Sequence, residues 1–352
     1  MLAYAYFYNG GGTATGDGDG LPDLVFTSNQ GKNRVFRNKG NFQFEDMTEV
    51  AGIAKFGGWS TGVSMADVNA DGLLDLYICR SALADPALRR NLLFINRGNF
   101  KFEEKATEMG LGLEPTWSTH ALFFDFDRDG DLDLFEINHS TNDFTKSGIS
   151  YATARQQTQK GIGNRLFEQK NGHFYDISEK AGIRSNVLTF SLGAAASDLT
   201  GDGWPDIYVG NDFHEHDYFY ENQRDGTFRE TSAAHFRHVS HFTMGVDAAD
   251  FDNDLLPDIF TLDMLPADRF SQQMAAGPDN FDKMQILEQA CFHPQTMRNM
   301  LQRNNGDGSF SEIGQLAGVS ATYWSWSALF GDFDLDGWKD IFVTNGYQRD
   351  YT

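Results

Sequence analysis

Six short runs of apolar residues recur along the chain, each directly after a segment rich in aspartate. They begin at residues 24, 76, 134, 207, 259 and 341 and read LVF, LYI, LFEI, IYV, IFTL and IFV. Aliphatic, β-branched and aromatic residues in runs this short predict β-strands. The apolar pattern therefore places six strands at equivalent positions of a repeating unit.

A second pattern lies between successive runs, in which two apolar segments flank a turn that contains glycine. It covers 33–53, 91–111, 164–183, 217–236 and 298–319. This arrangement is typical of a β-hairpin. An aromatic residue followed by small residues, such as Trp59 and Ser60, precedes most aspartate segments and predicts one more closely packed strand. Four antiparallel strands per repeat predict an all-β fold, a β-propeller of four-stranded blades.

Two repeats are longer than the others and contain insertions. Residues 139–163 and 264–297 lie between the predicted second and third strands of the third and fifth units. In the second insertion, FDKMQILEQA (281–290) has apolar residues at helical spacing. Both insertions leave from the same end of their blades, where long loops commonly carry binding sites. We expect residues 1–352 to form one propeller domain with these two insertions.

The aspartate segments share the pattern D-x-[DN]-x-D-G-x-x-D. Positions 1, 3, 5 and 9 carry side-chain oxygens that can converge on one point, and glycine at position 6 permits the positive φ of a tight turn. Oxygen ligands suit a hard cation, and Ca²⁺ takes about six to eight of them. The segment resembles the first half of an EF-hand loop, but it lacks the glutamate at position 12 and strands flank it. We predict up to six structural Ca²⁺ ions.

The predicted ligands are, loop by loop, Asp17, Asp19 and Asp23; Asp67, Asn69, Asp71 and Asp75; Asp125, Asp127, Asp129 and Asp133; Asp198, Thr200, Asp202 and Asp206; Asp250, Asp252, Asp254 and Asp258; and Asp332, Asp334, Asp336 and Asp340. The third, sixth and second loops have the best donor sets and the first has the poorest. The fifth has Leu255 where the pattern has glycine, which predicts backbone strain. Aspartate-rich turns also occur without an ion, but six copies at equivalent positions favour a metal.

Composition excludes some classes of function. The formal net charge of −22 excludes a nucleic-acid partner, because phosphates bind basic surfaces, and it favours cations or a basic partner. No apolar run is long enough to cross a bilayer, and the first residues lack the pattern of a signal peptide. The spacing of Cys79 and Cys291 gives no support for a disulfide, so we expect free thiols.

With these motifs the chain resembles FG-GAP/VCBS repeat proteins, whose calcium-loop blades also occur in the integrin α-subunit propeller. It is most similar to bacterial proteins of the cartilage-acidic-protein (ASPIC/UnbV-associated) type. The segments that carry the resemblance are NGGGTATGDGDGLPDL (9–24), NRVFRN (33–38), GNDF (210–213), RNMLQRNNGDGSFSEIGQLAGV (298–319) and WSWSALFGDFDLDGWKDIFVTNG (324–346).

The resemblance implies a seven-bladed propeller that is secreted, periplasmic or displayed on the cell surface and that serves in binding or adhesion. It also implies calcium at the loop positions named above. The chain supplies about five and a half to six blades and no ASPIC/UnbV domain. We therefore expect a fragment whose ring is open, with exposed strand edges.

The leading functional hypothesis is a calcium-binding propeller that acts as an extracellular binding or adhesion module toward a protein or glycan. A second is a carbohydrate-active enzyme, a polysaccharide lyase or glycosidase, on the insertion-bearing face. It would need Lys, Arg, Tyr or His side chains near a cleft. A third is a purely structural segment of a larger protein. We favour a protein without catalytic activity, because the chain contains no G-x-S-x-G, H-E-x-x-H or phosphate-binding motif.

Polar residues that follow the strands after the aspartate loops are the candidates for a ligand-binding face. They are Asn138, His139, Asn211, Asp212, His214, His216 and Asp263. His214 and His216 alternate along the chain and could bind a transition metal, although we favour a polar surface loop there. The histidines of HFRHVSHF (235–242) are expected in a connector between blades.

Overall fold

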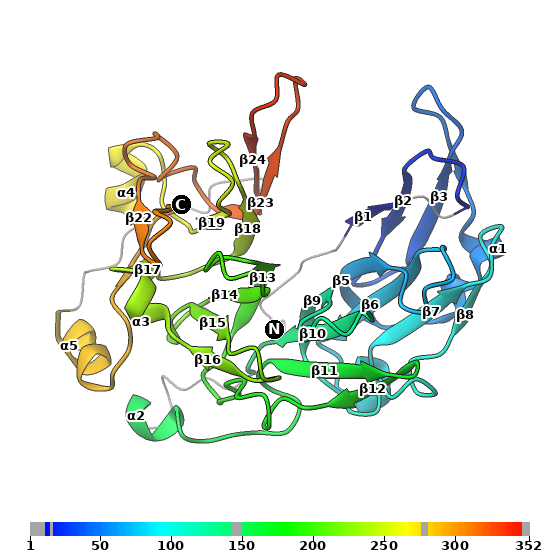
Figure 1. Ribbon diagram of the computed structural model, residues 1–352, viewed down its shortest axis with the longest axis horizontal. Coiled ribbons are helices and arrows are strands. Elements are labelled where there is room, and N and C mark those ends of the chain that lie inside the picture. The colour runs from blue at the N-terminus through cyan, green and yellow to red at the C-terminus, as the bar shows by residue number, and fades with distance from the viewer. Residues whose placement is uncertain (1–10, 15–16, 142–149, 276–280, 347–352) are drawn as a thin grey trace. The chain divides into compact units, whose positions relative to one another are not determined.

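The computed structural model describes residues 11–14, 17–141, 150–275 and 281–346 (Figure 1). These residues fall into two compact units. Unit 1 comprises the described parts of Met1–His139 and Lys160–Ser178, and unit 2 comprises those of Ser140–Gln159 and Glu179–Thr352. Each unit has its own antiparallel sheets and its own apolar cores.

Unit 1 contains three four-stranded sheets, and the strands of each follow the order of the chain. The strands are β1 (Gly11–Ala14), β2 (Asp23–Phe26), β3 (Arg34–Asn38) and β4 (Phe44–Asp46); β5 (Trp59–Ala66), β6 (Asp75–Ser81), β7 (Leu92–Asn96) and β8 (Phe102–Glu104); and β9 (Ser118–Phe124), β10 (Asp133–Asn138), β11 (Arg165–Lys170) and β12 (His173–Asp176). Short helical turns, α1 (Thr48–Ala51), η1 (Ile53–Lys55) and η2 (Pro86–Arg89), lie in the connections.

Unit 2 contains two four-stranded sheets and a two-stranded antiparallel sheet. The strands are β13 (Ser191–Ser197), β14 (Asp206–Asn211), β15 (Tyr218–Asn222) and β16 (Phe228–Glu230); β18 (Gly245–Ala249), β19 (Asp258–Leu262), β21 (Met300–Asn304) and β22 (Phe310–Glu312); and β23 (Ser325–Gly331) and β24 (Asp340–Asn345). The turn α3 (Ser232–His235) follows β16, and β17 (Val239–Ser240) pairs in parallel with β20 (Gln295–Thr296).

These sheets confirm the predicted all-β fold of four-stranded antiparallel propeller blades. The first strands of neighbouring blades lie side by side within each unit, because β5 contacts β1 and β9, and β18 contacts β13 and β23. A Cβ added at Gly193 would lie 2.8 Å from the backbone nitrogen of Val246, and one at Gly245 would lie 2.6 Å from the carbonyl oxygen of Trp326. Glycine on the innermost strands therefore sets how closely the blades approach.

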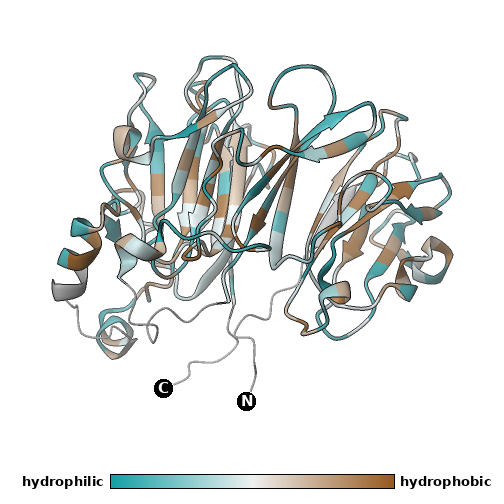
Figure 2. Cartoon of the chain, turned by 90° about the horizontal axis from the view of Figure 1, so that it is seen from below, coloured by the Kyte–Doolittle hydropathy of each residue, from teal (hydrophilic) through white to brown (hydrophobic). Residues whose placement is uncertain are grey.

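Burial explains why the apolar runs were visible in the sequence. The second strands β6, β10, β14 and β19 are buried along their whole length. A strand covered on both faces reads as an almost continuous apolar run. The fourth strand β4 is exposed throughout, and Figure 2 shows that hydrophobic residues concentrate on the strands while hydrophilic residues dominate the loops.

The two-stranded sheet ends in an exposed strand. Among the described residues β24 pairs only with β23. Leu329 and Phe342, one on each of these strands, are 49% and 55% exposed, whereas the corresponding strands of complete blades are covered. Within the described part of the chain, β24 is thus an edge strand.

The two insertions carry the longer helices. α2 (Tyr151–Ala154) lies between β10 and β11, while α4 (Arg269–Ala275) and α5 (Phe281–Gln289) lie between β19 and β21. The helical spacing at 281–290 correctly predicted α5, but α4 was not predicted. Parts of both insertions, 142–149 and 276–280, lie outside the described residues.

The described parts of the two insertions pack together in unit 2. Ala154 of α2 and Leu287 of α5 share one apolar cluster with Val187, Leu188 and Phe292. Each insertion thereby covers apolar surface of the other.

None of the described helices has the length and apolar character needed to cross a membrane. Cys79 is buried and Cys291 is exposed, and both are free thiols, as expected.

Candidate metal centres

The aspartate loops occupy one position in every blade, where they join the first strand to the second. The loop at 125–133, for example, leads from β9 to β10. In all six loops the residue at position 6 has a positive φ, as the glycine pattern predicted. Leu255 adopts a φ of 70° at this position of the fifth loop, so the predicted strain at a side chain larger than glycine is present.

A second left-handed residue in each loop was missed by the sequence analysis. Position 4 also has a positive φ, and it is occupied in chain order by Gly18, Ala70, Arg128, Gly201, Asn253 and Leu335. Because most of these residues have a side chain, composition gave no signal for this turn. The two left-handed residues alternate with positions 3 and 5, and the chain coils around the acidic side chains.

The aspartate at position 1 organises the loop through backbone hydrogen bonds. In the third loop Asp125 accepts from the N–H of Asp129 (3.1 Å) and of Gly130 (3.1 Å). Equivalent pairs of hydrogen bonds occur in the second, fourth, fifth and sixth loops. These hydrogen bonds hold the loop in its conformation without the help of an ion.

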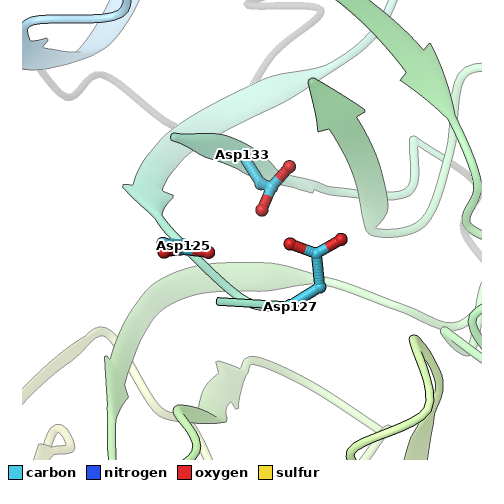
Figure 3. Close-up of side chains that lie close together, drawn as sticks. All are labelled: Asp125, Asp127 and Asp133. Atoms are coloured by element: carbon cyan, nitrogen blue, oxygen red, sulfur yellow. The ribbon is translucent and has the colours of Figure 1, made fainter. Parts of the chain in front are cut away.

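Three loops bring three carboxylates close to one point. The groups are Asp125, Asp127 and Asp133; Asp250, Asp252 and Asp254; and Asp332, Asp334 and Asp336, with one oxygen of each residue within 4.8 Å of the others. Figure 3 shows the three carboxylates of the third loop turned toward a common space. The sequence had predicted all nine of these residues as ligands. Asp129, Asp258 and Asp340 do not belong to these groups.

In the five four-stranded blades the last aspartate of the loop is buried and joins the loop to the sheet, whereas Asp340 of the sixth loop is exposed. Asp133 is fully buried and accepts hydrogen bonds from the N–H of Phe126 (3.1 Å) and of Gln169 (2.8 Å) on β11. Asp75, Asp206 and Asp258 make the same two contacts in their blades. One carboxylate therefore fixes both the loop and the start of the second strand to the third strand.

An amide residue at the end of the third strand completes this contact. Its side chain donates to the carbonyl just before the buried aspartate, at 2.8–3.2 Å. The residues are Asn38, Asn96, Gln169, Asn222 and Asn304. Sequence reasoning missed them, although an Asn or Gln at this place in five hairpins was a visible signal.

Burial raises the pKa of the loop-ending carboxyls. It brings the pKa of Asp133 to about 8 and those of Asp75, Asp206 and Asp258 to about 6, although backbone N–H groups act in the opposite direction. A bound cation would favour the ionised forms. In the fifth loop, Asp252 Oδ1 is buried without a hydrogen-bond partner among the described residues. The donor set therefore fits a hard cation such as Ca²⁺.

In three loops an arginine of the same blade contacts the carboxylates. The pairs are Arg37 with Asp17 (2.7 Å), Arg224 with Asp202 (2.6 Å) and Arg303 with Asp252 (2.7 Å). In the second blade Arg97 instead pairs with Glu103 at 2.9 Å, and in the third Lys170 pairs with Glu168 at 2.6 Å. The first, fourth and fifth loops thus have an arginine in direct contact with their carboxylates, whereas Lys170 of the third blade is paired with Glu168 and acts on Asp127 and Asp129 only at longer range.

The residues predicted to form a ligand-binding face lie mostly inside the fold. Six of them, Asn138, His139, Asn211, Asp212, His216 and Asp263, are buried, and His214 is half-buried. Asp263 accepts from the hydroxyl of Ser240 at 2.7 Å and from two backbone N–H groups. As placed, the six buried side chains hold loops together, and they do not form an exposed surface. Among the described residues, none of the three acidic groups that could hold a metal includes a histidine.

Buried charge also links the insertions in unit 2. Arg155, just after α2, lies 2.9 Å from the fully buried carboxylate of Glu215 and donates to the carbonyl of Cys291. Asn186 donates to the same carboxylate at 3.0 Å. Removing one partner of a buried ion pair leaves an uncompensated charge, so Arg155 is expected to be essential for the packing of both insertions.

A second repeated contact lies at the blade end opposite the loops. A residue at the start of the third strand, or just before it, accepts a hydrogen bond through its side-chain oxygen. The donor is the backbone N–H of a residue near the end of the second strand, or just beyond it. The accepting residue is Asn33, Asn91, Asn164 and Asn299 in the first, second, third and fifth blades, and Asp217 in the fourth. Asp217 also accepts from the hydroxyls of Tyr208 and Thr243 at 2.8 Å each. Burial raises the pKa of Asp217 to about 7.

Comparison with known proteins places these blades in a family context. Residues 17–78, 198–261 and 290–343, about half of the chain, match the FG-GAP-like repeat. Cartilage acidic protein 1 of Xenopus tropicalis is 29% identical over 186 residues, which are 52% of this chain and 25% of that protein. The chain therefore spans about a quarter of the length of this relative.

Among solved structures, the V. cholerae biofilm matrix protein Bap1 aligns with 86% of this chain and 38% of its own chain. The sequence identity is 12% and the TM-score is 0.40.

We predict that Asp217→Asn stabilises the chelated protein at pH 8 by about 2–4 kcal/mol and has little effect near pH 4. A carboxyl whose folded pKa is raised to about 7 binds more protons in the folded state than in the unfolded state, so wild type loses stability as the pH rises from about 4 through 7. Asparagine already occupies this position in four blades and should fit. Urea denaturation at several pH values measures the difference, and parallel pH profiles for the two proteins would contradict the prediction.

Proposed function

Because the chain belongs to the family of FG-GAP-like repeat proteins, we propose that it is a calcium-stabilised propeller module that binds a protein or glycan outside the cell. The observation that carries the proposal is the convergence of Asp125, Asp127 and Asp133 on one point, in a loop that recurs in every blade. A cation there would link each loop to its sheet and keep the blades rigid enough to present a binding surface.

The proposed calcium ligands are the side chains at positions 1, 3, 5 and 9, with a backbone carbonyl at position 7. Three carboxylates within 4.8 Å of one another repel in the absence of a cation, and Ca²⁺ would reverse that interaction. The ion would also act on the buried aspartate that binds the third strand, so its effect would extend from the loop to the whole blade.

Adding Ca²⁺ to chelated protein is expected to raise the melting temperature by roughly 8 °C or more, because a ligand at about 1,000 times its Kd stabilises by about 4 kcal/mol per site. Equimolar Mg²⁺ should do less. Asp127→Asn should reduce the gain, while the neighbouring Asp131→Asn, at position 7, should retain it. Identical melting curves with chelator and with Ca²⁺ would reject calcium binding.

The arginine contacts refine the order of affinity among the loops. A guanidinium beside the carboxylates competes electrostatically with the ion, which supports the second and third loops as tighter sites and predicts weaker binding in the first, fourth and fifth. Leu255 adds backbone strain to the fifth loop.

Arg303→Gln is expected to strengthen Ca²⁺ binding at one site by up to about fivefold, since a half-exposed ion pair contributes about 0.2–1 kcal/mol. Arg97→Gln is the matched control, because Arg97 pairs with Glu103 and contacts no loop carboxylate. Calorimetric titration of both variants measures the change. An equal change in the two variants would show that net charge alone matters.

An extracellular location and a role in adhesion rest on the family and on the name of the curated relative, cartilage acidic protein 1. The net charge of −22 supports a basic protein or a neutral glycan as the partner. We expect the immobilised protein to capture a ligand from an array of glycans and extracellular proteins in Ca²⁺ and to release it in chelator. Binding that is the same in both buffers would contradict a role for calcium in presenting the surface.

The hypothesis of a carbohydrate-active enzyme remains a prediction that polysaccharide cleavage assays can test. The described loop acids are accounted for by their backbone contacts and by the proposed ion, and a binding module requires no further role for them.

A further inference from the structure

A cavity of about 290 Å³ lies in unit 1 and belongs to none of the aspartate loops. The connector that follows β8 forms one wall with Gly112 and Leu113, and β11 and β12 form another with Arg165 and Tyr175. Asn91, next to the start of β7, also lines it. Asn91 and Arg165 lie at the ends of β7 and β11 that are opposite the aspartate loops. The volume is at the small end of the range for small-molecule sites.

The wall contributed by β12 carries two aromatic rings. His173 and Tyr175 have ring centroids 4.6 Å apart at an interplanar angle of 39°, and Tyr175 is 50% exposed. Phe167 and Phe174 add apolar surface to the lining. The exposed Tyr175 ring beside the His173 ring offers a platform for a flat molecule that has C–H groups on one face.

Polar groups complete the wall and are held in fixed positions. Glu136 is buried and accepts from the hydroxyl of Tyr77 at 2.8 Å and from the amides of Asn91 and Asn138. Arg165 is held by Asp176, at 3.0 Å from its Nε. Groups fixed in this way can meet a ligand without losing side-chain freedom on binding.

One buried polar atom of the lining lacks a partner. His173 Nδ1 makes no hydrogen bond within the described part of the chain. It lies against Gly110, where an added Cβ would come within 2.8 Å of this nitrogen. A buried polar atom without a partner is rare in a folded protein, and at the wall of a cavity it is a position where a ligand hydroxyl would gain a hydrogen bond.

We propose that this cavity binds a single neutral sugar ring, the terminal residue of a glycan. The aromatic pair would contact the C–H face of the ring, and the polar groups would contact its hydroxyls. The lining carboxylates of Glu114, Glu136 and Asp176 outnumber the one lining guanidinium, Arg165, so uronic and sialic acids are disfavoured. This assignment rests on the proposed binding function and names the ligand class.

The lining is arranged for binding and not for cleavage. Both oxygens of Glu136 already accept hydrogen bonds, and both oxygens of Asp176 are engaged, by Arg165 and by Ser178. Neither carboxyl is free to deliver a proton to a glycosidic oxygen or to activate water. The third lining carboxylate, Glu114, pairs with Lys160 at 2.8 Å, so the lining offers no two free carboxyls for hydrolysis, and the sugar would be retained unchanged.

Titrating the full chain in Ca²⁺ with glucose, galactose, mannose and N-acetylglucosamine tests the assignment, with glucuronic acid as the anionic probe. Ligand-observed NMR and calorimetry should detect binding of at least one neutral sugar and weaker binding of glucuronic acid. Tyr175→Ala should weaken binding at least tenfold, and Leu113→Trp should block it by filling the cavity. Both residues are exposed enough for the variants to fold, which circular dichroism can verify.

Phe44→Ala and Leu88→Trp are the matched controls, because both residues are partly exposed in the same unit and line no part of the cavity; both should bind like wild type. Failure of all four neutral sugars to bind, tighter binding of glucuronic acid, or binding unchanged in both cavity variants would overturn the assignment. Release of a reducing sugar from a bound oligosaccharide would also overturn it. If Leu113→Trp still captures a ligand on the array, the cavity is not the binding site, although the proposed adhesion function stands. If the wild-type protein binds a sugar but captures no ligand on the array, the cavity assignment stands and the adhesion function is contradicted.

Discussion

Four of the blades depend on a buried carboxylate whose two oxygens bind backbone N–H groups of different segments. Asp133 shows the arrangement: one oxygen fixes its own loop and the other fixes β11. Burial is the main reason why the pKa of Asp133 is raised to about 8, while the two backbone N–H groups lower it and the carboxylates of Asp127 and Asp131 raise it further. The neighbouring acids of the loop add to the negative charge of this carboxylate, and a cation is the simplest group that can balance it.

A second constraint acts at the other end of the blade, where an asparagine, or Asp217 in the fourth blade, joins the second and third strands. Together the two contacts fix the central pair of strands at both ends and leave the connectors between blades and the insertions free to vary. The variable parts differ in what they form. In unit 2 the insertions bury Glu215 and the histidine beside it, whereas in unit 1 the connector after β8 leaves a lined cavity. Binding chemistry is thus expected where the repeat is interrupted.

Several features were predictable because they are local. The aspartate spacing, the turn at position 6 and the helix α5 each depend on a few adjacent residues, and all three were found. The left-handed residue at position 4 was missed, because Ala70, Arg128 and Leu335 have no special tendency toward this conformation. Backbone hydrogen bonds to position 1 impose it. The polar residues after the second strands were assigned to a surface, but the structure buries them, since a polar side chain that binds backbone groups looks the same in sequence as an exposed one.

The sequence by itself determined the repeat, the strands, the type of blade and the residues that could hold an ion, because short apolar runs and fixed spacing in a loop are encoded within one repeat. Only the tertiary structure decided which carboxylates meet, which arginines contact them and where a cavity remains. Arg303 and Asp252 are 51 residues apart, and Asn91 and Tyr175 come from different blades. Contacts between such residues depend on how strands and blades pack, and no local pattern specifies that.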